Sequence, residues 1–168
     1  RPVNPVSLAL GAEATFVART VDTERAHLTE VLRAAAAHPG AAFVEIYQNC
    51  NVFNDGQFNS VTKRNVRDEM MIDLVHGQPI RFGVDGHRGI VMGPDGQLRI
   101  VEVDEVGADA VLVHDAHRWE PSLAFALAHL SADDRSPTPF GVFRDVERPE
   151  YTSMVANQVA EASERRGP

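Results

Sequence analysis

The chain has 168 residues, of which 43% are hydrophobic and 24% charged, as expected for one globular domain with its own core. Its net charge of −8, without a stripe of Lys and Arg, argues against a nucleic-acid-binding surface, and no apolar run reaches the roughly 18 to 20 residues of a membrane span. No signal pattern opens the sequence, so we expect a reducing, cytoplasmic location. The missing initiator methionine indicates processing, a cloning boundary or a piece of something longer.

The first third of the chain has a strand, helix, strand pattern. Residues 15–19 predict a buried strand, and 42–47 predict a second one. Between them, Asp22 and Thr23 offer N-cap oxygens to a helix that ends at Pro39-Gly40. Its apolar face comprises Ala26, Leu28, Val31, Leu32 and Ala35. Such units are almost always parallel and right-handed, so the predicted fold class is α/β with a parallel sheet.

The middle of the chain changes character. Residues 62–74 predict a polar helix with one apolar edge, which stops near Gly77 and Pro79. Three short β-type runs follow, at 79–83, 89–92 and 98–103. The last two are separated by a strong turn signal, Gly93-Pro94-Asp95-Gly96. We therefore expect a small antiparallel β element appended to the α/β body.

The last third predicts two strands and two helices. The strands are expected over 110–113 and 140–143, the second of them closing the fold. The helices are expected over 122–130, entered through Pro121, and over 151–165, where Arg165-Arg166 would complement the helix dipole. The expected division of the single domain is a βαβ part, 1–58, and a C-terminal region with the hairpin and helices, 59–168.

The common nucleotide and hydrolase motifs are missing. The sequence has no Gly-x-Gly-x-x-Gly loop, no Walker loop and no Gly-x-Ser-x-Gly elbow. The segment His114-Asp115-Ala116-His117 places two imidazoles three residues apart beside a carboxylate, which could hold a metal if helical. Because no third ligand is evident, surface histidines at a strand end are the favoured interpretation.

Cys50 is the single cysteine, which excludes an intrachain disulfide or a site of several thiolates from this chain alone. The turn formers Asn49, Asn51, Asn54 and Asp55 surround it. They place Cys50 at the mouth of a loop after a strand, where open α/β sheets present ligand-binding atoms. Three interpretations stay open: a small buried hydrophobe, a nucleophile with one of seven histidines as base, and one thiolate of an iron–sulfur cluster shared with other cysteines outside the chain.

Several segments resemble the β subunit of bacterial 2-oxoacid:ferredoxin oxidoreductases, most closely the 2-oxoglutarate branch. They are 4–19, 42–56, 76–83, 112–116 and 139–144, so the resemblance covers nearly the whole chain. The segment around Cys50 is the most specific of them. The resemblance implies a thiamine diphosphate enzyme that decarboxylates a 2-oxoacid, passes electrons through a [4Fe-4S] cluster to ferredoxin, and forms an acyl-CoA.

The resemblance also assigns residues and partners. Cys50 matches the fourth cluster cysteine, and Asn49, Asn51 and Asn54 are candidates to surround the cofactor. Arg81 and Arg144 could meet an acidic group of a partner or substrate, although surface salt bridges explain them equally well. The implied partners are an α or fused γα subunit, the N-terminal half of the β subunit, ferredoxin, CoA and a 2-oxoacid.

The departures from the family pattern are large. The family's Cys-x-x-Cys, its third cysteine, and the Gly-Asp-Gly-Asp segment with downstream Asn that holds Mg²⁺ and the diphosphate are missing. The chain therefore resembles the C-terminal half of a β subunit, with residues 1–58 expected as the βαβ part of its thiamine diphosphate-binding domain, and it is expected to be inactive by itself. Two other functions remain open: a non-catalytic fragment or interaction module that keeps the fold, and a cysteine-dependent hydrolase or transferase with a histidine near Cys50.

Overall fold

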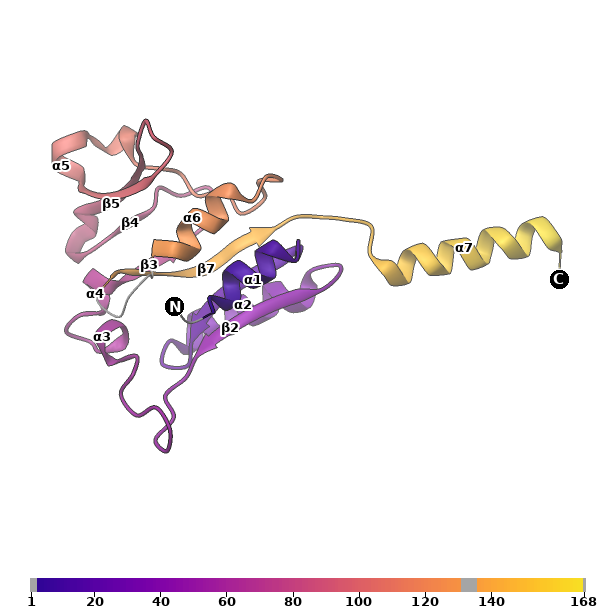
Figure 1. The fold of residues 1–168 in the computed structure, drawn as a ribbon, viewed down its shortest axis with the longest axis horizontal. Coiled ribbons are helices and arrows are strands. Elements are labelled where there is room, and N and C mark those ends of the chain that lie inside the picture. Colours follow the sequence, from indigo (N-terminus) through magenta and orange to yellow (C-terminus); the bar gives the residue numbers. More distant parts are fainter. Residues whose placement is uncertain (1–2, 131–135, 168) are drawn as a thin grey trace.

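The computed structural model describes residues 3–130 and 136–167, and its main sheet has four strands (Figure 1). They are β1 (Phe16–Val21), β2 (Ala42–Tyr47), β3 (Met71–Leu74) and β7 (Thr138–Asp145), in the order β2-β1-β7-β3. The pairs β1–β2 and β3–β7 are parallel, whereas β1–β7 is antiparallel. The α/β class is confirmed, but an entirely parallel sheet is wrong, because β7 enters the sheet opposite in direction to β1.

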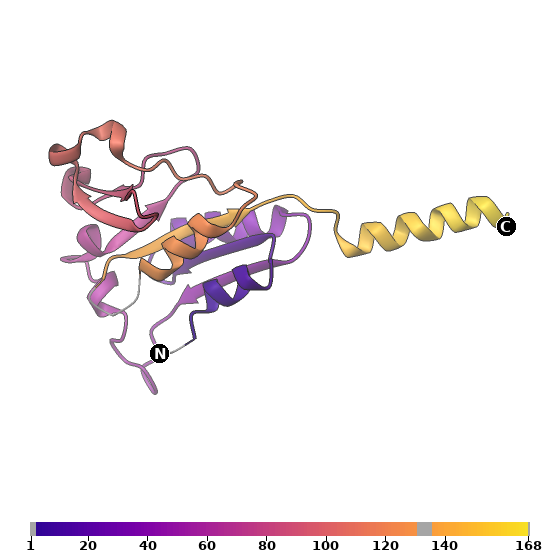
Figure 2. The same cartoon turned by 45° about the horizontal axis from the view of Figure 1, so that its top comes forward.

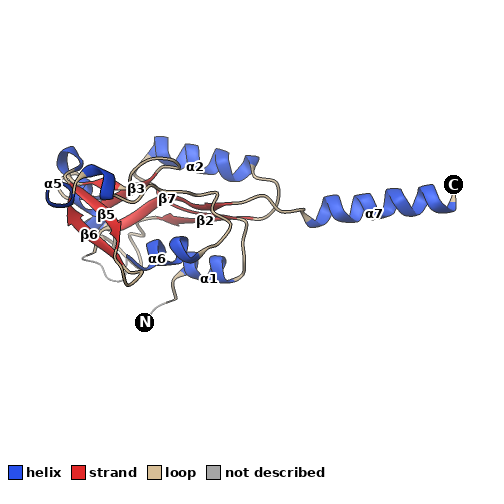
Figure 3. Ribbon diagram, turned by 90° about the horizontal axis from the view of Figure 1, so that it is seen from above, coloured by secondary structure: helices blue, strands red, loops and turns tan. Residues whose placement is uncertain are grey.

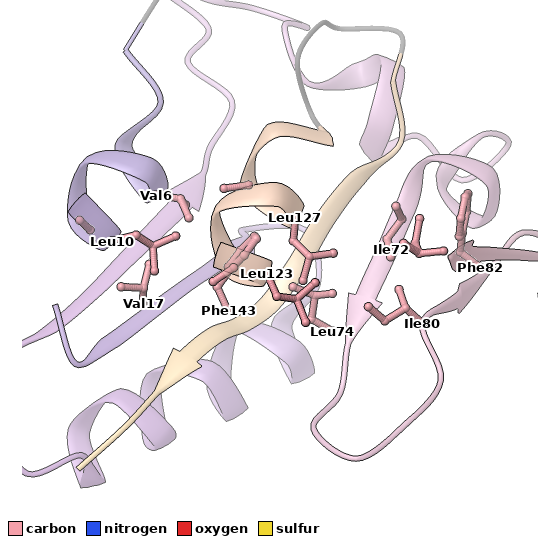
Figure 4. Close-up of a cluster of buried hydrophobic side chains, with 14 residues drawn as sticks. Val6, Leu10, Val17, Ile72, Leu74, Ile80, Phe82, Leu123, Leu127 and Phe143 are labelled. Atoms are coloured by element: carbon pink, nitrogen blue, oxygen red, sulfur yellow. The ribbon is translucent and has the colours of Figure 1, made fainter. Parts of the chain in front are cut away.

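Helices cover both faces of this sheet (Figure 3). Helix α2 (Arg25–Ala37) lies on one face, where Val31 packs against Phe16 and Ala18. Helices α1 (Pro5–Gly11) and α6 (Ser122–Leu130) lie on the other. The largest buried cluster forms beneath them and includes Val6, Leu10, Val17, Leu127 and Phe143 (Figure 4). None of the helices within 3–130 and 136–167 is both long and apolar enough to cross a bilayer.

The appended antiparallel element is confirmed. It consists of β4 (Arg81–Phe82), β5 (Arg88–Met92) and β6 (Leu98–Glu102), joined in that order. The short segments η1 (Val84–Gly86), α5 (Val103–Val106) and η2 (Ala108–Ala110) surround it. The main buried cluster extends into this small sheet through Phe82, shown in Figure 4, and it also includes Ile90 of β5.

The single helix predicted over 62–74 is wrong. This stretch forms the end of α3 (Asn59–Thr62), then α4 (Arg67–Met70), then strand β3. The apolar residues near its end also fit a two-residue alternation, and β3 buries Ile72 and Leu74. Pairing with β7 therefore outweighs the local helical pattern.

Two smaller expectations also fail. The strand predicted over 110–113 is absent, because η2 occupies its start and Val113 makes only an isolated bridge to Pro79. The N-cap of α2 is Glu24 without a side-chain bond, not Asp22 or Thr23. Asp22 instead prolongs the pairing of the parallel strands, since its N–H donates to the carbonyl of Tyr47 at 3.0 Å.

Strand β7 is longer than its prediction and lies inside the sheet rather than at its edge. It can pass close to β3 because position 141 is a glycine. Gly141 has φ +117°, and a Cβ there would lie 2.5 Å from the carbonyl oxygen of Leu74. β7 belongs to the predicted C-terminal region yet pairs with β1 of the βαβ part.

Both C-terminal helices are confirmed, α6 at its predicted bounds and α7 over Tyr151–Arg166. Glu150 caps α7 by accepting from the backbone N–H groups of Thr152 and Ser153. Figure 1 and Figure 2 show α7 extending away from the rest of the protein.

Candidate functional site

The candidate site is the Cys50 loop, residues 48–58, which connects β2 to α3. β2 is an edge strand, and the loop leaves its carboxyl end and projects from the sheet (Figure 1). Cys50 follows Tyr47, the last residue of β2, by three positions. It is a free, half-buried cysteine near the start of the loop.

Backbone amides lie near the sulfur of Cys50. The N–H groups of Phe53, Val52 and Asn54 lower the pKa of the thiol, with Phe53 having the largest effect. The chain turns tightly to permit this, with the Asn54 N–H also donating to the Cys50 carbonyl at 2.9 Å. Donors of this kind favour the thiolate over the thiol. The interpretation of Cys50 as an inert buried hydrophobe does not fit such surroundings.

Asn49 holds the loop in this shape. Its Nδ2 donates to Oδ1 of Asn51 at 2.7 Å and to Oδ1 of Asp55 at 3.0 Å, and its Oδ1 accepts from the Gly56 N–H at 2.8 Å. All three predicted asparagines are exposed, and the side chains of Asn49 and Asn51 bond within the loop. Sequence reasoning missed the bonds from Asn49 to Asp55 and Gly56, for which the clustered turn formers were the only signal.

Aromatic rings fix both ends of the loop to the sheet. The rings of Tyr47 and Phe58 stack with centroids 4.3 Å apart, and Tyr47 meets Phe140 of β7 edge-on at 5.4 Å. Between these anchors the loop exposes Val52 and Phe53, which are 80% and 90% accessible. A sulfur with amide donors and two exposed apolar side chains therefore share one anchored loop.

The histidines bond to other groups. In the described part of the chain, the groups that lower the pKa of the Cys50 thiol are backbone amides and not imidazoles. His27 bonds to Thr20, and His38 lies between Asp145 and Thr15, each at 2.8 to 2.9 Å. Within the residues that the structure describes, each histidine is thus bonded to a group other than Cys50, so none of them is placed there as the general base that a cysteine hydrolase needs.

The pair His114 and His117 is not the surface pair that the sequence predicts. His117 is exposed, but His114 is 1% accessible and its Nε2 donates to the carbonyl of Val142 at 2.7 Å. Burial lowers the pKa of His114. Within residues 3–130 and 136–167, no group of three or more His, Cys, Asp or Glu side chains is arranged to hold a metal ion.

Each of the two predicted arginines donates a hydrogen bond to a backbone carbonyl outside the Cys50 loop. Arg81 donates from Nε to the carbonyl of Gly86 at 2.8 Å. Arg144 is buried, and its Nη2 donates to the carbonyl of Trp119 at 3.1 Å. A surface salt bridge is therefore the wrong interpretation for Arg144, because β7 carries it into the interior.

Comparison with known proteins finds several relatives, although no family model matches the chain. Over 161 residues the chain is 48% identical to 2-oxoglutarate oxidoreductase subunit KorB of Mycobacterium tuberculosis, covering 96% of this chain and 43% of that subunit. Over 53 residues it is 43% identical to 2-oxoacid:ferredoxin oxidoreductase 1, subunit beta, of Aeropyrum pernix and 38% identical to the corresponding subunit of Saccharolobus solfataricus. These two matches cover 32% of this chain and 17% of each relative.

An α/β chain with these relatives is a homologue of the β subunits of 2-oxoacid oxidoreductases. Its similarity is to the 2-oxoglutarate oxidoreductase subunit KorB in particular, and it corresponds to part of such a subunit, spanning less than half the length of that relative. The resemblance drawn from the sequence is confirmed.

Proposed function

We propose that this chain is part of the β subunit of a 2-oxoglutarate:ferredoxin oxidoreductase and that Cys50 is one ligand of its [4Fe-4S] cluster. The observation that carries the proposal is the place of the free, half-buried Cys50 in the loop at the carboxyl end of β2, where backbone amides also lower the pKa of its thiol. Iron binds the thiolate form, which these amides favour. Hydrogen bonds to cluster sulfurs also tune the reduction potential.

Cys50 would supply one of the four ligands of the cluster. A [4Fe-4S] cluster takes four thiolates, and this chain has one cysteine, so the other three would come from the N-terminal half of the β subunit. Asn49 would keep the amides of the loop aligned on the sulfur. The exposed side chains of Val52 and Phe53 would shield the metal centre from water once a second surface meets them.

The rest of the chemistry belongs to the assembled enzyme. Thiamine diphosphate with Mg²⁺, when bound, supplies the electron sink for decarboxylation of the 2-oxoacid. The Gly-Asp-Gly-Asp segment that the resemblance assigns to Mg²⁺ is missing from this sequence, so that ion would be bound outside this chain. An α or fused γα subunit would complete the sites for CoA and the 2-oxoacid, with ferredoxin accepting the electrons. We place this assembly in the cytoplasm.

The test is Cys50→Ala in the intact subunit, assembled with its companion chains. We expect loss of ferredoxin reduction and of cluster iron and sulfide, with thiamine diphosphate binding retained, because the diphosphate segment lies elsewhere. Circular dichroism of the variant checks that the fold is kept. Unchanged electron transfer would refute the role of Cys50 as a ligand.

The two alternatives predict different results in the same system. A non-catalytic interaction module would bind no iron whichever chain is added. A cysteine hydrolase would keep its thiol reactive toward iodoacetamide in the assembled enzyme, whereas a cluster ligand would be protected. Reactivity of the isolated chain does not separate the two, because the amides already lower the pKa of the free thiol.

A further inference from the structure

Strand β2 forms one edge of the main sheet, and within the described part of the chain β1 is its only partner strand (Figure 1). Successive residues of a strand direct their N–H and C=O groups alternately to its two sides. The carbonyl of Tyr47 accepts from the N–H of Asp22, just past the end of β1, so the odd-numbered residues of β2 face β1. The N–H and C=O groups of Val44 and Ile46 therefore point away from the sheet.

The side chains of β2 are those of an interior strand. Its sequence, Ala-Phe-Val-Glu-Ile-Tyr, contains one charged residue. Phe43 packs against the main buried cluster and Val44 against the cluster beneath α2, so both faces of the strand are apolar. Apolar runs of this kind are typical of strands that are covered on both faces inside α/β sheets. Ile46 is nevertheless 43% exposed.

The two edges of the main sheet differ in how they are protected. Natural edge strands are often short, carry a charge, Lys or Pro, or are covered by another element. The other edge strand, β3, has four residues, exposes Asp73 and packs through Ile72 in the same cluster as Phe82 of the small sheet. β2 has six residues without Pro or Lys, and its one charge, Glu45, is already paired with Arg19 at 2.6 Å. A strand added beside β2 would thus bury no unpaired charge.

We propose that a strand from the remaining part of the β subunit pairs with the outer side of β2 and extends the main sheet. The chain spans 43% of the KorB subunit that it resembles, so more than half of a subunit of that length lies outside it. That length is ample for further strands of ordinary size. The loop that leaves β2 also exposes Val52 and Phe53, so one partner would cover the strand edge and the loop together.

The first test compares amide hydrogen exchange, read residue by residue, in the isolated 168-residue chain and in the intact β subunit. We expect the amides of Val44 and Ile46 to exchange at least about tenfold more slowly in the intact subunit, because they then donate to the added strand. The amides of Phe43 and Glu45 face β1 in both forms and are the internal controls. Equal rates for Val44 and Ile46 in the two forms would overturn the inference. Protection in the isolated chain that rises with its concentration would also overturn it and assign the edge to a second copy.

The second test separates pairing with a strand from simple burial. Ile46→Pro removes the outward N–H group and leaves the groups that face β1 in place, as an edge strand tolerates. We expect it to lower the midpoint of thermal unfolding more in the intact subunit than in the isolated chain. The matched control, Ile46→Val, keeps the N–H group and should shift the midpoint by similar amounts in both forms. Equal shifts for Ile46→Pro in the two forms would overturn the strand pairing.

The inference shares one premise with the proposed function, namely that the chain is part of a β subunit, but it does not depend on the role of Cys50. A third measurement keeps the two apart. In the intact subunit with Cys50→Ala, the amides of Val44 and Ile46 should stay protected even where cluster iron is lost. Rapid exchange of both amides in an intact wild-type subunit that binds cluster iron would overturn the strand pairing and leave the role of Cys50 standing.

Discussion

The central strands bury a charged side chain, whereas the Cys50 loop exposes apolar ones. On β1, Arg19 is 1% exposed, with Nε 2.6 Å from a carboxylate oxygen of Glu45 and Nη1 3.2 Å from the carbonyl of Pro139. The sheet thus buries a charge and satisfies it internally. The Cys50 loop bonds its polar groups within itself and turns Val52 and Phe53 outward.

The difference separates a region whose polar groups are satisfied internally from one that we propose is covered by another chain. The buried Arg19 has partners on both neighbouring strands of its own sheet. The exposed apolar side chains beside the sulfur are of the kind that marks interaction surfaces. Substitutions in the sheet should therefore cost stability, and substitutions in the loop should change chemistry.

The largest expected loss of stability is that of Arg19→Ala. It leaves the mostly buried carboxylate of Glu45 without its cation, so we expect the free energy of unfolding in urea to fall by about 3 kcal/mol. The matched control is the double variant Arg19→Met with Glu45→Leu, which removes both charges and should recover most of the loss. A loss below about 1 kcal/mol for Arg19→Ala would show that the pair is not structurally important.

Gly141→Ala should rank second. The new Cβ would meet the carbonyl oxygen of Leu74 at a φ that L side chains rarely adopt, so we expect thermal unfolding to show a loss of about 2 kcal/mol. The control is Gly96→Ala in the β5–β6 turn, where φ is +75° but nothing lies within 4 Å of the new atom. Equal losses in the two variants would mean that the approach of β3 to β7 is not tight.

The sequence pattern predicted correctly those helices and strands whose formation depends on residues close together in the sequence. The strand at 42–47 and the helix at 122–130 are found at their predicted bounds, because continuous apolar runs and flanking turn residues define them. The helix predicted over 62–74 failed, because β3 depends on pairing with β7, more than 60 residues away in the sequence. The same long-range pairing hid the antiparallel direction of β7.

The site was predictable in position but not in detail. Asparagines around Cys50 indicated a loop after a strand, which the structure contains. Sequence spacing could not show that Asn49 bonds to Gly56 or that backbone amides lower the pKa of the Cys50 thiol, since both depend on the geometry of the turn. Nor could it show that Arg144 and His114 are buried, because their types are usually exposed.

A smaller effect should appear as a pH dependence of stability. Burial lowers the pKa of His114 in the folded chain, so below the ordinary pKa of about 6.5 the unfolded chain binds a proton that the folded chain does not. The stability that neutral His114 contributes is thus present above that pH and lost as the pH falls. We expect the advantage of the wild type over His114→Gln, measured by urea unfolding, to shrink between about pH 7.5 and pH 5.5.

The control for this experiment is His129→Gln, whose imidazole is exposed on α6 and bonds to the carbonyl of Phe125. Because that side chain is exposed, its substitution should change the free energy of unfolding at pH 7.5 by less than the substitution of His114 does. If the curve of stability against pH for His114→Gln is parallel to that of the wild type, the folded chain protonates His114 as readily as the unfolded chain, and burial is not decisive there.

The smallest change in stability, but a specific change in chemistry, is expected for Asn49→Ala. It removes the bonds to Asn51, Asp55 and Gly56, so the amides should point less closely at the sulfur and the pKa of the Cys50 thiol should rise toward its ordinary value. The rate of alkylation by iodoacetamide, followed against pH in the isolated chain, should then show a midpoint at higher pH than in the wild type. Asn54→Ala, which changes an exposed side chain on the same loop, should leave that midpoint in place. An unchanged midpoint in Asn49→Ala would mean that the turn holds its amides on the sulfur without Asn49, and the difference between sheet and loop would then lie in the backbone alone.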